Sequence, residues 1–395
     1  MKTNKTLYSV IVVSTVLVLF LFLVLSTASA SITEKRITSH GTASSPAIYD
    51  KNIVWQDNRT GNWNIYSYNL SNHKEIHTTN LSDQVEPAVY GSKVVWIDIL
   101  DRIDNNYWGN VYLYDIFTKK QTLIPTSGAA RSPSIYGNNI VWVDADNVFL
   151  YNISTKKQTR LYSNLSPTQT AIYGNRVVWS RDTVDYTYIY MYEISTKKQS
   201  QIATFYLANS PAIYGNRIIW EAYGNVYMYD ITTQKQTRIT TRGSAQSPAI
   251  YGNNIVWQDN RNGNWDIYAY DLVSRQQIHT TDKSDQYSPA VYRDKVVWID
   301  NRSGKPDVYM GTLSYLPVAA FTASPTSGKA PLKVQFKDKS TDAYYWYWNF
   351  GDKTTSTLQS PLHQYKKAGK YTVTLTVKNA AGTNTKTTTS YITVK

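Results

Sequence analysis

The sequence has no cysteine among its 395 residues, and it contains only 5 histidines and 4 methionines. Without cysteine the chain can form neither disulfide bonds nor thiolate metal sites. The patterns H-E-x-x-H and G-x-S-x-G, which mark zinc peptidases and serine hydrolases, are also absent. These absences exclude several common catalytic designs, and we expect no cofactor and no metal site.

Long hydrophobic runs are equally scarce, because the single one lies near the N-terminus. It is unbroken over residues 16–25, follows two lysines and precedes Ala28-Ser29-Ala30. A basic segment, an apolar segment and small residues in this order predict a secretory signal over residues 1–30. The alternative is an uncleaved leader that attaches the chain to a membrane, because residues 11–13 extend the apolar stretch. Either interpretation predicts an exported protein, extracellular or at the cell surface.

Acidic residues are few relative to basic ones, 28 against 41, so the formal net charge is +13. The excess is concentrated in Pro317–Lys395, where 11 Lys and 3 Asp give +8. No nucleic-acid-binding motif accompanies these lysines, so no nucleic-acid partner is expected. A basic C-terminal region instead favours acidic partners such as cell-envelope proteins or anionic polysaccharide. Nothing in the sequence indicates the oligomeric state.

Tyrosine and tryptophan, in contrast, are abundant, with 34 and 12 copies. Seven near-copies of the segment at residues 247–271, SPAIYGNNIVWQDNRNGNWDIYAYD, follow one another along the chain. Their shared tryptophans, 37 to 46 residues apart, are Trp55, Trp96, Trp142, Trp179, Trp220, Trp257 and Trp298. Self-similarity at this period predicts a β-propeller with one four-stranded blade per repeat. We therefore predict an all-β chain in which residues 31–316 form a seven-bladed propeller with these tryptophans in its core.

Each repeat divides into four short strands. Strand A reads S-P-A-I-Y, strand B reads I-V-W, strand C reads I-Y-x-Y, and strand D follows a polar S-T-K-K-Q turn. Gly, Asn and Asp between such runs are typical of β-hairpins. The seventh repeat stops after strand C, whereas Glu34–Thr38 resembles the strand D segment Lys235–Thr240. We therefore expect the N-terminal segment to complete the last blade and close the ring, which removes exposed sheet edges.

All variation in repeat length lies between strands B and C. The distance from the tryptophan to the strand C aromatic varies from 7 to 16 residues, whereas the distance from that aromatic to the next tryptophan is always 30. Insertions confined to one face of a repeat protein commonly mark its binding face. The longest B–C loop, Asp98–Asn110 in blade 2, has Tyr107 and Trp108 near its tip. We predict that the B–C loops form an acidic binding face, and that lysine-rich C–D turns make the rim of the opposite face basic.

Five B–C loops carry an aspartate two residues after the tryptophan. The aspartates are Asp57, Asp98, Asp144, Asp259 and Asp300, and an arginine follows in three copies, Arg59, Arg261 and Arg302. One interpretation is a ring of oxygen ligands for Ca²⁺. The other, which we favour, is that each aspartate accepts backbone N–H groups of its own loop, with the arginine as its partner. These residues join Tyr107 and Trp108 as candidate binding residues of the B–C face.

The sequence after the repeats has a different pattern. Short apolar and polar alternations such as Y-T-V-T-L-T-V predict about seven strands in an Ig-like β-sandwich over residues 317–395. Trp346 and Trp348 are the predicted core aromatics.

Both parts of the chain resemble known families. The repeats, with I-V-W-x-D-N-R-x-G-N-x-x-I-Y-x-Y-D, resemble the TolB-type propeller repeat. The C-terminal part resembles a PKD domain, whose W-x-F-G-D and H-x-Y motifs are Trp348–Asp352 and His363–Tyr365. Asn349 and Lys353 stand where that family usually has Asp and Gly, which alters the turn. The pairing of the two units resembles cell-surface and surface-layer proteins of methanogenic archaea.

Catalytic residues are not indicated. A glycosidase requires two carboxylates across a cleft, and Glu86 and Glu221 are the acids to consider. Asn-x-Ser/Thr sequons predict glycosylation sites on an exported chain. They occur at Asn58, Asn69, Asn80, Asn152, Asn164 and Asn301.

These patterns together lead us to expect a non-enzymatic cell-surface protein for envelope structure, adhesion or recognition of protein or polysaccharide. Two alternatives remain open. One is a carbohydrate-active lyase or hydrolase that acts on surface polysaccharide, and the other is a TolB-like protein-docking module.

Overall fold

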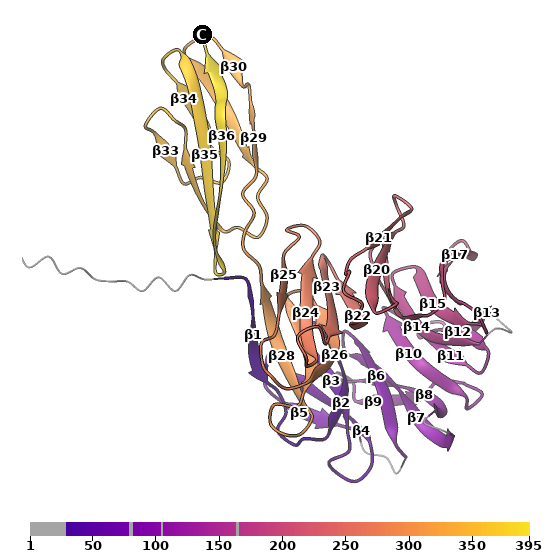
Figure 1. Cartoon of the computed structure of the whole chain (residues 1–395). Helices are drawn as coiled ribbons and strands as arrows, with labels where there is room; N and C mark the ends of the chain where they lie inside the picture. Colours follow the sequence, from indigo (N-terminus) through magenta and orange to yellow (C-terminus); the bar gives the residue numbers. More distant parts are fainter. Residues whose placement is uncertain (1–28, 79–81, 104–105, 163–165) are drawn as a thin grey trace, which may run out of the picture.

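A computed structural model describes residues 29–78, 82–103, 106–162 and 166–395. All the regular secondary structure in these ranges is β-strand, so the all-β prediction is confirmed. The strands form a disc and a smaller C-terminal unit that stands off from it (Figure 1). Within the described ranges, no helix has the length and apolar character needed to cross a membrane. The predicted leader falls almost entirely outside the described residues.

The disc consists of seven four-stranded antiparallel blades, as the repeats predict. Blade 1 contains β2 (Ala43–Tyr49), β3 (Asn52–Asp57), β4 (Asn64–Asn69) and β5 (Glu75–His77). Blade 2 contains β6 (Gln84–Tyr90), β7 (Lys93–Ile103), β8 (Asn106–Asp115) and β9 (Lys120–Leu123). Blade 3 contains β10 (Ala130–Tyr136), β11 (Asn139–Asp144), β12 (Asn147–Asn152) and β13 (Lys157–Tyr162).

The remaining four blades repeat this order. Blade 4 contains β14 (Pro167–Tyr173), β15 (Arg176–Asp182), β16 (Thr187–Glu193) and β17 (Lys198–Phe205). Blade 5 contains β18 (Ala208–Tyr214), β19 (Arg217–Ala222), β20 (Asn225–Asp230) and β21 (Lys235–Arg238). Blade 6 contains β22 (Ala245–Tyr251), β23 (Asn254–Asp259), β24 (Asp266–Asp271) and β25 (Gln277–His279). Blade 7 contains β26 (Gln286–Tyr292), β27 (Lys295–Asp300), β28 (Asp307–Ser314) and, as its outer strand, β1 (Ser31–Arg36).

The ring is closed by the N-terminal strand, as predicted. β1 pairs antiparallel with β28 from Ser31↔Ser314 to Arg36↔Tyr309. Side chains reinforce the closure, because Arg36 lies 2.5 Å from the carboxylate of Asp307 and Arg302 lies 2.5 Å from that of Glu34. The first and last parts of the repeat region are therefore locked into one sheet, and the disc has no open seam at this blade.

The core of the disc is made by the recurring tryptophans. All seven have a relative exposure of 0%. Each stacks on the aromatic residue opposite it on strand C, with ring centroids 5.7–6.3 Å apart. Transfer of one such ring from water contributes on the order of 4–6 kcal/mol. Their structural role is confirmed.

The tyrosines at which the seven A strands end form a closed ring. The ring runs through Tyr49, Tyr90, Tyr136, Tyr173, Tyr214, Tyr251 and Tyr292 and returns to Tyr49, with neighbouring centroids 4.4–4.7 Å apart. Tilted aromatic pairs at this distance attract each other beyond their burial. The ring narrows the central channel beside the A–B turns, where a space of about 170 Å³ remains.

Two details of the blades differ from the sequence-based expectation. Strand D begins one or two residues earlier than predicted, because the last lysine of the turn is already paired, as in Asp230↔Lys235. In blade 2 the predicted long loop is instead a hairpin, since β7 and β8 stay paired out to Ile103↔Asn106. Residues 104–105 at its tip lie outside the described residues.

The C-terminal unit is a β-sandwich of eight strands, one more than predicted. One sheet contains β29 (Phe321–Ser324), β31 (Leu332–Asp338) and β34 (Leu362–Tyr365). The other contains β30 (Ser327–Gly328), β36 (Gly382–Val394), β35 (Gly369–Asn379), β32 (Tyr345–Asn349) and β33 (Thr355–Ser356). Trp348 is fully buried between them, whereas Trp346 is only partly buried and donates its indole N–H to Asp338.

The predicted sequence motifs of this sandwich meet in one cluster. The ring of Phe350 stacks on that of His363 at 4.1 Å, and Asp352 accepts a hydrogen bond from the same imidazole at 2.8 Å. The hydroxyl of Tyr365 donates to the carbonyl of Phe350. Lys353, which replaces the usual glycine, keeps a positive φ of 72°. This turn therefore places a residue with a side chain in the left-handed region, where its backbone is strained.

Candidate functional site

The aspartates of blades 1, 6 and 7 lie inside their blades. Asp57 accepts hydrogen bonds from the indole of Trp55 at 3.1 Å, from the backbone N–H of Arg59 at 3.0 Å and from its guanidinium at 2.6 Å. Thr42 donates a further one at 2.5 Å. Burial by itself would raise the pKa of Asp57, but these donors outweigh it and hold the pKa below its usual value.

Asp259 and Asp300 repeat this arrangement. Each accepts from the tryptophan two residues earlier and from both the backbone and the guanidinium of Arg261 or Arg302. The arginines also cover the strand C tyrosine, with the guanidinium carbon 4.1–4.5 Å from the ring centroid. The favoured interpretation, an aspartate bound to its own loop with an arginine partner, is confirmed for these three blades.

The other blades lack this arrangement of aspartate, tryptophan and arginine. Asp98 accepts from the hydroxyl of Ser82, and Asp144 accepts from the backbone N–H and hydroxyl of Ser127. Blades 4 and 5 have Arg181 and Ala222 at this position.

All five aspartates have a relative exposure of 4% or less. The expectation that they make the B–C face acidic is therefore wrong, because a side chain two residues after a buried tryptophan points to the same side of its strand. For the same reason they offer no surface ligands for a cation. Among the described residues no group of three or more His, Asp or Glu is arranged to hold a metal ion.

The blade 2 hairpin is the largest departure from the repeat on the B–C face. Trp108 pairs with Asp101 in the hairpin and has a relative exposure of 37%, while Leu100 reaches 63%. The backbone of Tyr107 pairs with Arg102, and its side chain lies outside the described residues. Gly109 pairs with Ala130, so that blades 2 and 3 form one continuous eight-stranded sheet. An exposed tryptophan is thus held on a hairpin with extra support at its base.

Two charged residues lie on the inner strands of the same two blades. Glu86 stands where other blades have Ser or Gln, and Arg131 stands where they have Ser, Val, Thr, Asn, Gln or Tyr. The carboxylate of Glu86 accepts from the backbone N–H of Ser132 at 2.7 Å, and the guanidinium of Arg131 donates to the carbonyl of Pro167 at 2.8 Å. Burial raises the pKa of Glu86 and lowers that of Arg131. Our sequence reasoning missed Arg131, although comparison of equivalent positions among the seven blades singles it out.

The remaining candidate catalytic groups are dispersed. Glu221 lies in β19, three blades away from Glu86, and no hydrogen bond or ion pair joins the two among the described residues. Burial also raises the pKa of Glu221. The imidazoles of His77 and His279 stack on Tyr66 and Tyr268 at 5.0 and 4.8 Å. These histidines extend the aromatic layers of their blades.

The sequons divide into three groups. Asn58 and Asn301 lie half-buried in B–C loops. The amides of Asn69 and Asn152 donate to Asn52 and Asn139 and cap their own C–D turns. Asn80 and Asn164 fall outside the described residues.

The predicted basic rim is present on the other face. The C–D lysines are all exposed, at Lys119, Lys120, Lys156, Lys157, Lys197, Lys198 and Lys235.

Comparison with known proteins identifies the C-terminal unit. The PKD domain family matches residues 316–394. Collagenase ColA of Bacillus cereus is 42% identical over 67 residues, which are 16% of this chain and 7% of that protein. Collagenase ColQ1 of the same species is 37% identical over 76 residues, 18% of this chain and 8% of that protein. This chain thus spans less than a tenth of the length of these relatives.

The disc is similar in fold to known β-propellers. An oligogalacturonate lyase in complex with manganese has a TM-score of 0.54 at 12% identity, over 73% of this chain and 95% of that one. The β-propeller domain of the trilobed protease from Pyrococcus furiosus has a TM-score of 0.53 at 13% identity, over 69% and 95%. TolB from Acinetobacter baumannii reaches only 0.43 at 14% identity, over 58% and 62%. At these identities the likeness concerns the fold alone, and the chain is a seven-bladed β-propeller followed by a PKD domain.

Proposed function

We propose that this protein is an exported, non-enzymatic cell-surface protein that recognises envelope protein or polysaccharide through the B–C face of its propeller. The observation that carries the proposal is the blade 2 hairpin, which presents Trp108 to solvent. Exposed aromatic side chains contribute disproportionately to binding energy. The PKD domain and its collagenase relatives fit an extracellular setting. The N-terminal apolar run favours a cleaved or anchoring leader, the sequons favour glycosylation, and the resemblance to surface-layer proteins of methanogenic archaea favours a place in the cell envelope.

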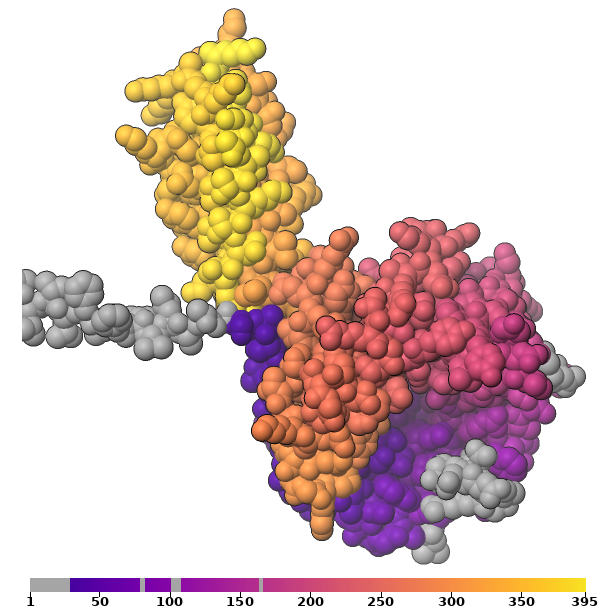
Figure 2. All heavy atoms as spheres, in the orientation of Figure 1, coloured from indigo at the N-terminus to yellow at the C-terminus, as the bar shows by residue number. Residues whose placement is uncertain are grey.

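The position of the PKD domain supports this assignment of faces. The chain leaves the disc at the end of β28, on the side of the C–D turns. In Figure 2 the C-terminal unit (yellow) rises beside the N-terminal strand (indigo). The PKD domain therefore occupies the face opposite to the B–C loops and serves in this proposal as a basic spacer or attachment module.

The test shortens the hairpin without disturbing the blade. Ile99 and Gly109 are paired neighbours, so residues 100–108 can be replaced by Asn-Gly, which favours a two-residue hairpin turn. We expect the variant to fold with an unchanged circular dichroism spectrum and to bind isolated cell envelope at least about tenfold more weakly. Replacement of Trp108 alone by alanine should produce most of this loss. Undiminished binding by both variants would refute the proposal.

An enzymatic role is the second candidate, favoured by Glu86, whose raised pKa suits a proton donor. If the propeller cleaves surface polysaccharide, incubation with acidic and neutral glycans should yield new reducing or unsaturated ends, and Glu86→Gln should abolish them. A TolB-like docking role would instead be recognised by capture of specific envelope proteins through the same hairpin in a pull-down from detergent-solubilised envelope.

A further inference from the structure

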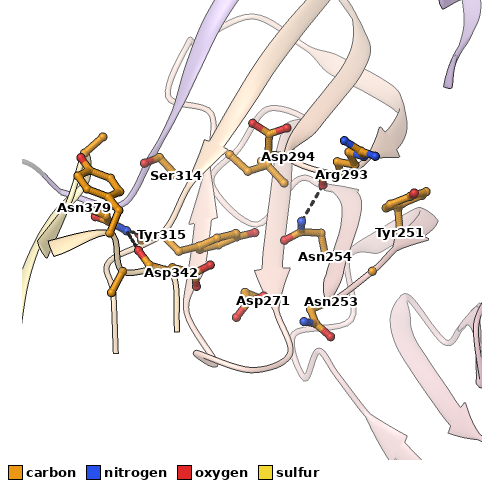
Figure 3. Close-up of a pocket in the computed structure, with 15 residues that line it drawn as sticks. Tyr251, Asn253, Asn254, Asp271, Arg293, Asp294, Ser314, Tyr315, Asp342 and Asn379 are labelled. Carbon is orange, nitrogen blue, oxygen red and sulfur yellow. Dashed lines mark hydrogen bonds between the residues drawn. The ribbon is translucent and has the colours of Figure 1, made fainter. Parts of the chain in front are cut away.

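A cavity of about 530 Å³ lies where the propeller meets the PKD domain (Figure 3). The propeller contributes the A–B turns of blades 6 and 7 and the end of β24, and the PKD domain contributes residues 342–344 and 379–380. Ser314 and Tyr315, which connect the two domains, complete the wall. The volume is within the range of small-ligand sites.

The walls of this cavity are fixed relative to each other. The side-chain amide of Gln276 in blade 6 donates to the carbonyl of Leu316 at 2.8 Å and accepts from its N–H at 3.0 Å. From the other side, Asn379 donates to the carbonyls of Tyr315 and Asp342, both at 2.8 Å. Because the linker is bound by both domains, the cavity is preformed.

The charges in the cavity are predominantly negative. Asp271, Asp294 and Asp342 line it together with a single cation, Arg293. Asp294 is paired with Lys295 at 3.0 Å, whereas Asp271 and Asp342 have no ion-pair partner among the described residues. Burial and the charge of Asp271 raise the pKa of Asp342. A cationic group between the two carboxylates would relieve their repulsion.

Two buried polar atoms in the wall also lack partners. The hydroxyl of Tyr315 and Oδ1 of Asn254 have no hydrogen-bond partner among the described residues. Tyr315 has a relative exposure of 8%, and Figure 3 shows its ring extending into the cavity between Asp271 and Asn254. Buried polar groups are rarely left unpaired. Both atoms can accept hydrogen bonds, so an N–H or O–H donor that reaches them would satisfy them.

We infer that this cavity binds a small amino sugar through its free ammonium group. The ammonium donates to the carboxylates of Asp271 and Asp342, and the hydroxyls of the sugar donate to the unpartnered wall atoms. The side chains of Tyr251 and Tyr344 line the same space. The site is on the opposite side of the disc from the B–C face, so it is independent of the function proposed above.

The test uses two sugars that differ only at the nitrogen. Purified protein is titrated calorimetrically with D-glucosamine and with N-acetyl-D-glucosamine at about pH 6.5, where an alkyl ammonium group is charged. We expect saturable binding of D-glucosamine and at least about tenfold weaker binding of the acetylated sugar. Equal binding of both sugars, no binding of either, or displacement of D-glucosamine by calcium chloride at equimolar concentration would overturn the inference.

Two variants locate the binding in the cavity. Asp342→Asn removes one carboxylate and should weaken D-glucosamine about tenfold. Tyr315→Phe keeps the ring, removes only the hydroxyl and should weaken it several-fold, which leaves a second test if the first variant folds poorly. Asp185→Asn changes an exposed carboxylate in the B–C loop of blade 4 and should have no effect. Unchanged binding by both cavity variants would place the sugar elsewhere and overturn the inference.

Discussion

At the scale of single residues, each buried aspartate of blades 1, 6 and 7 accepts several stabilising hydrogen bonds and an ion pair. Asp259 accepts hydrogen bonds from a tryptophan indole and a backbone N–H, and it also pairs with a guanidinium. An ion removed from water is stabilising only when such donors surround it. The same three contacts recur in neighbouring blades around the seam of the ring, since blades 6, 7 and 1 are adjacent.

Substitution of Asp259 by asparagine should be strongly destabilising. It leaves Arg261 without its counter-ion, and breaking one side of a buried pair costs about 3–5 kcal/mol. The lowered pKa of Asp259 means that its contribution is present above the unfolded-state value near 3.9 and is lost as pH falls through the folded value. Thermal melts should therefore show a large gap between the wild type and the variant at neutral pH that narrows in acid. Asp185→Asn should melt like the wild type, and an equally mild effect of Asp259→Asn would contradict the assignment.

Glu86 should behave in the opposite way. Its pKa is raised by burial, so the folded state holds the proton more tightly, and stability declines as pH rises from the unfolded-state value near 4.3 towards the folded value. Glu86→Gln keeps an acceptor for the N–H of Ser132 and removes the charge. We expect the variant to melt at a higher temperature than the wild type at pH 8 and at the same temperature near pH 4. A lower melting temperature at pH 8 would show that the charged carboxylate stabilises the channel wall.

At the scale of elements, ring closure depends on six residues that are far from their partners in sequence. β1 covers the outer edge of β28, which would otherwise expose unpaired backbone groups. Gly311 of β28 permits close packing, because a Cβ atom there would collide with Ile32 and Trp298. The closure is thus specified by both strands.

Removal of residues up to Thr38 should open blade 7 and cause self-association. The truncated chain loses the pairing with β28 and the ion pairs of Arg36 and Glu34. Size-exclusion chromatography should show oligomers or aggregates in place of the species formed by the intact chain. A synthetic peptide of residues 29–42 should restore the original profile, whereas a scrambled peptide should not. A truncated chain that elutes like the intact one would show that blade 7 is stable with three strands.

These elements also show what the sequence could and could not predict. The blades and the closing strand could be predicted because each repeat carries the same alternation of buried and exposed residues, and a missing strand D at one end matches an extra one at the other. The hairpin of blade 2 could not, because its inserted residues have no counterpart in the other repeats. The burial of Asp57 was predictable in principle from its spacing to Trp55. The cavity residues Asp271, Tyr315 and Asp342 were not, because two domains bring them together.

At the scale of the whole molecule, the decisive feature is the joint between the two domains. The linker is short, and its backbone at Tyr315 and Leu316 is bound by Gln276 from the propeller and by Asn379 from the PKD domain. Each such hydrogen bond contributes about 1 kcal/mol. A few contacts of this size are enough to favour one orientation of two domains strongly, since 1.4 kcal/mol corresponds to a factor of ten.

Gln276→Ala should therefore loosen the joint and leave both domains folded. The variant loses both hydrogen bonds to Leu316, while Asn379 still holds the PKD side of the linker. Small-angle X-ray scattering should show a broader distribution of intramolecular distances, with an unchanged melting temperature. Gln277→Ala is the matched control, because this neighbouring side chain is exposed in β25. Since the cavity needs walls from both domains, D-glucosamine should bind Gln276→Ala more weakly than Gln277→Ala. If scattering broadens while binding is unaffected, the sugar is held by one domain alone.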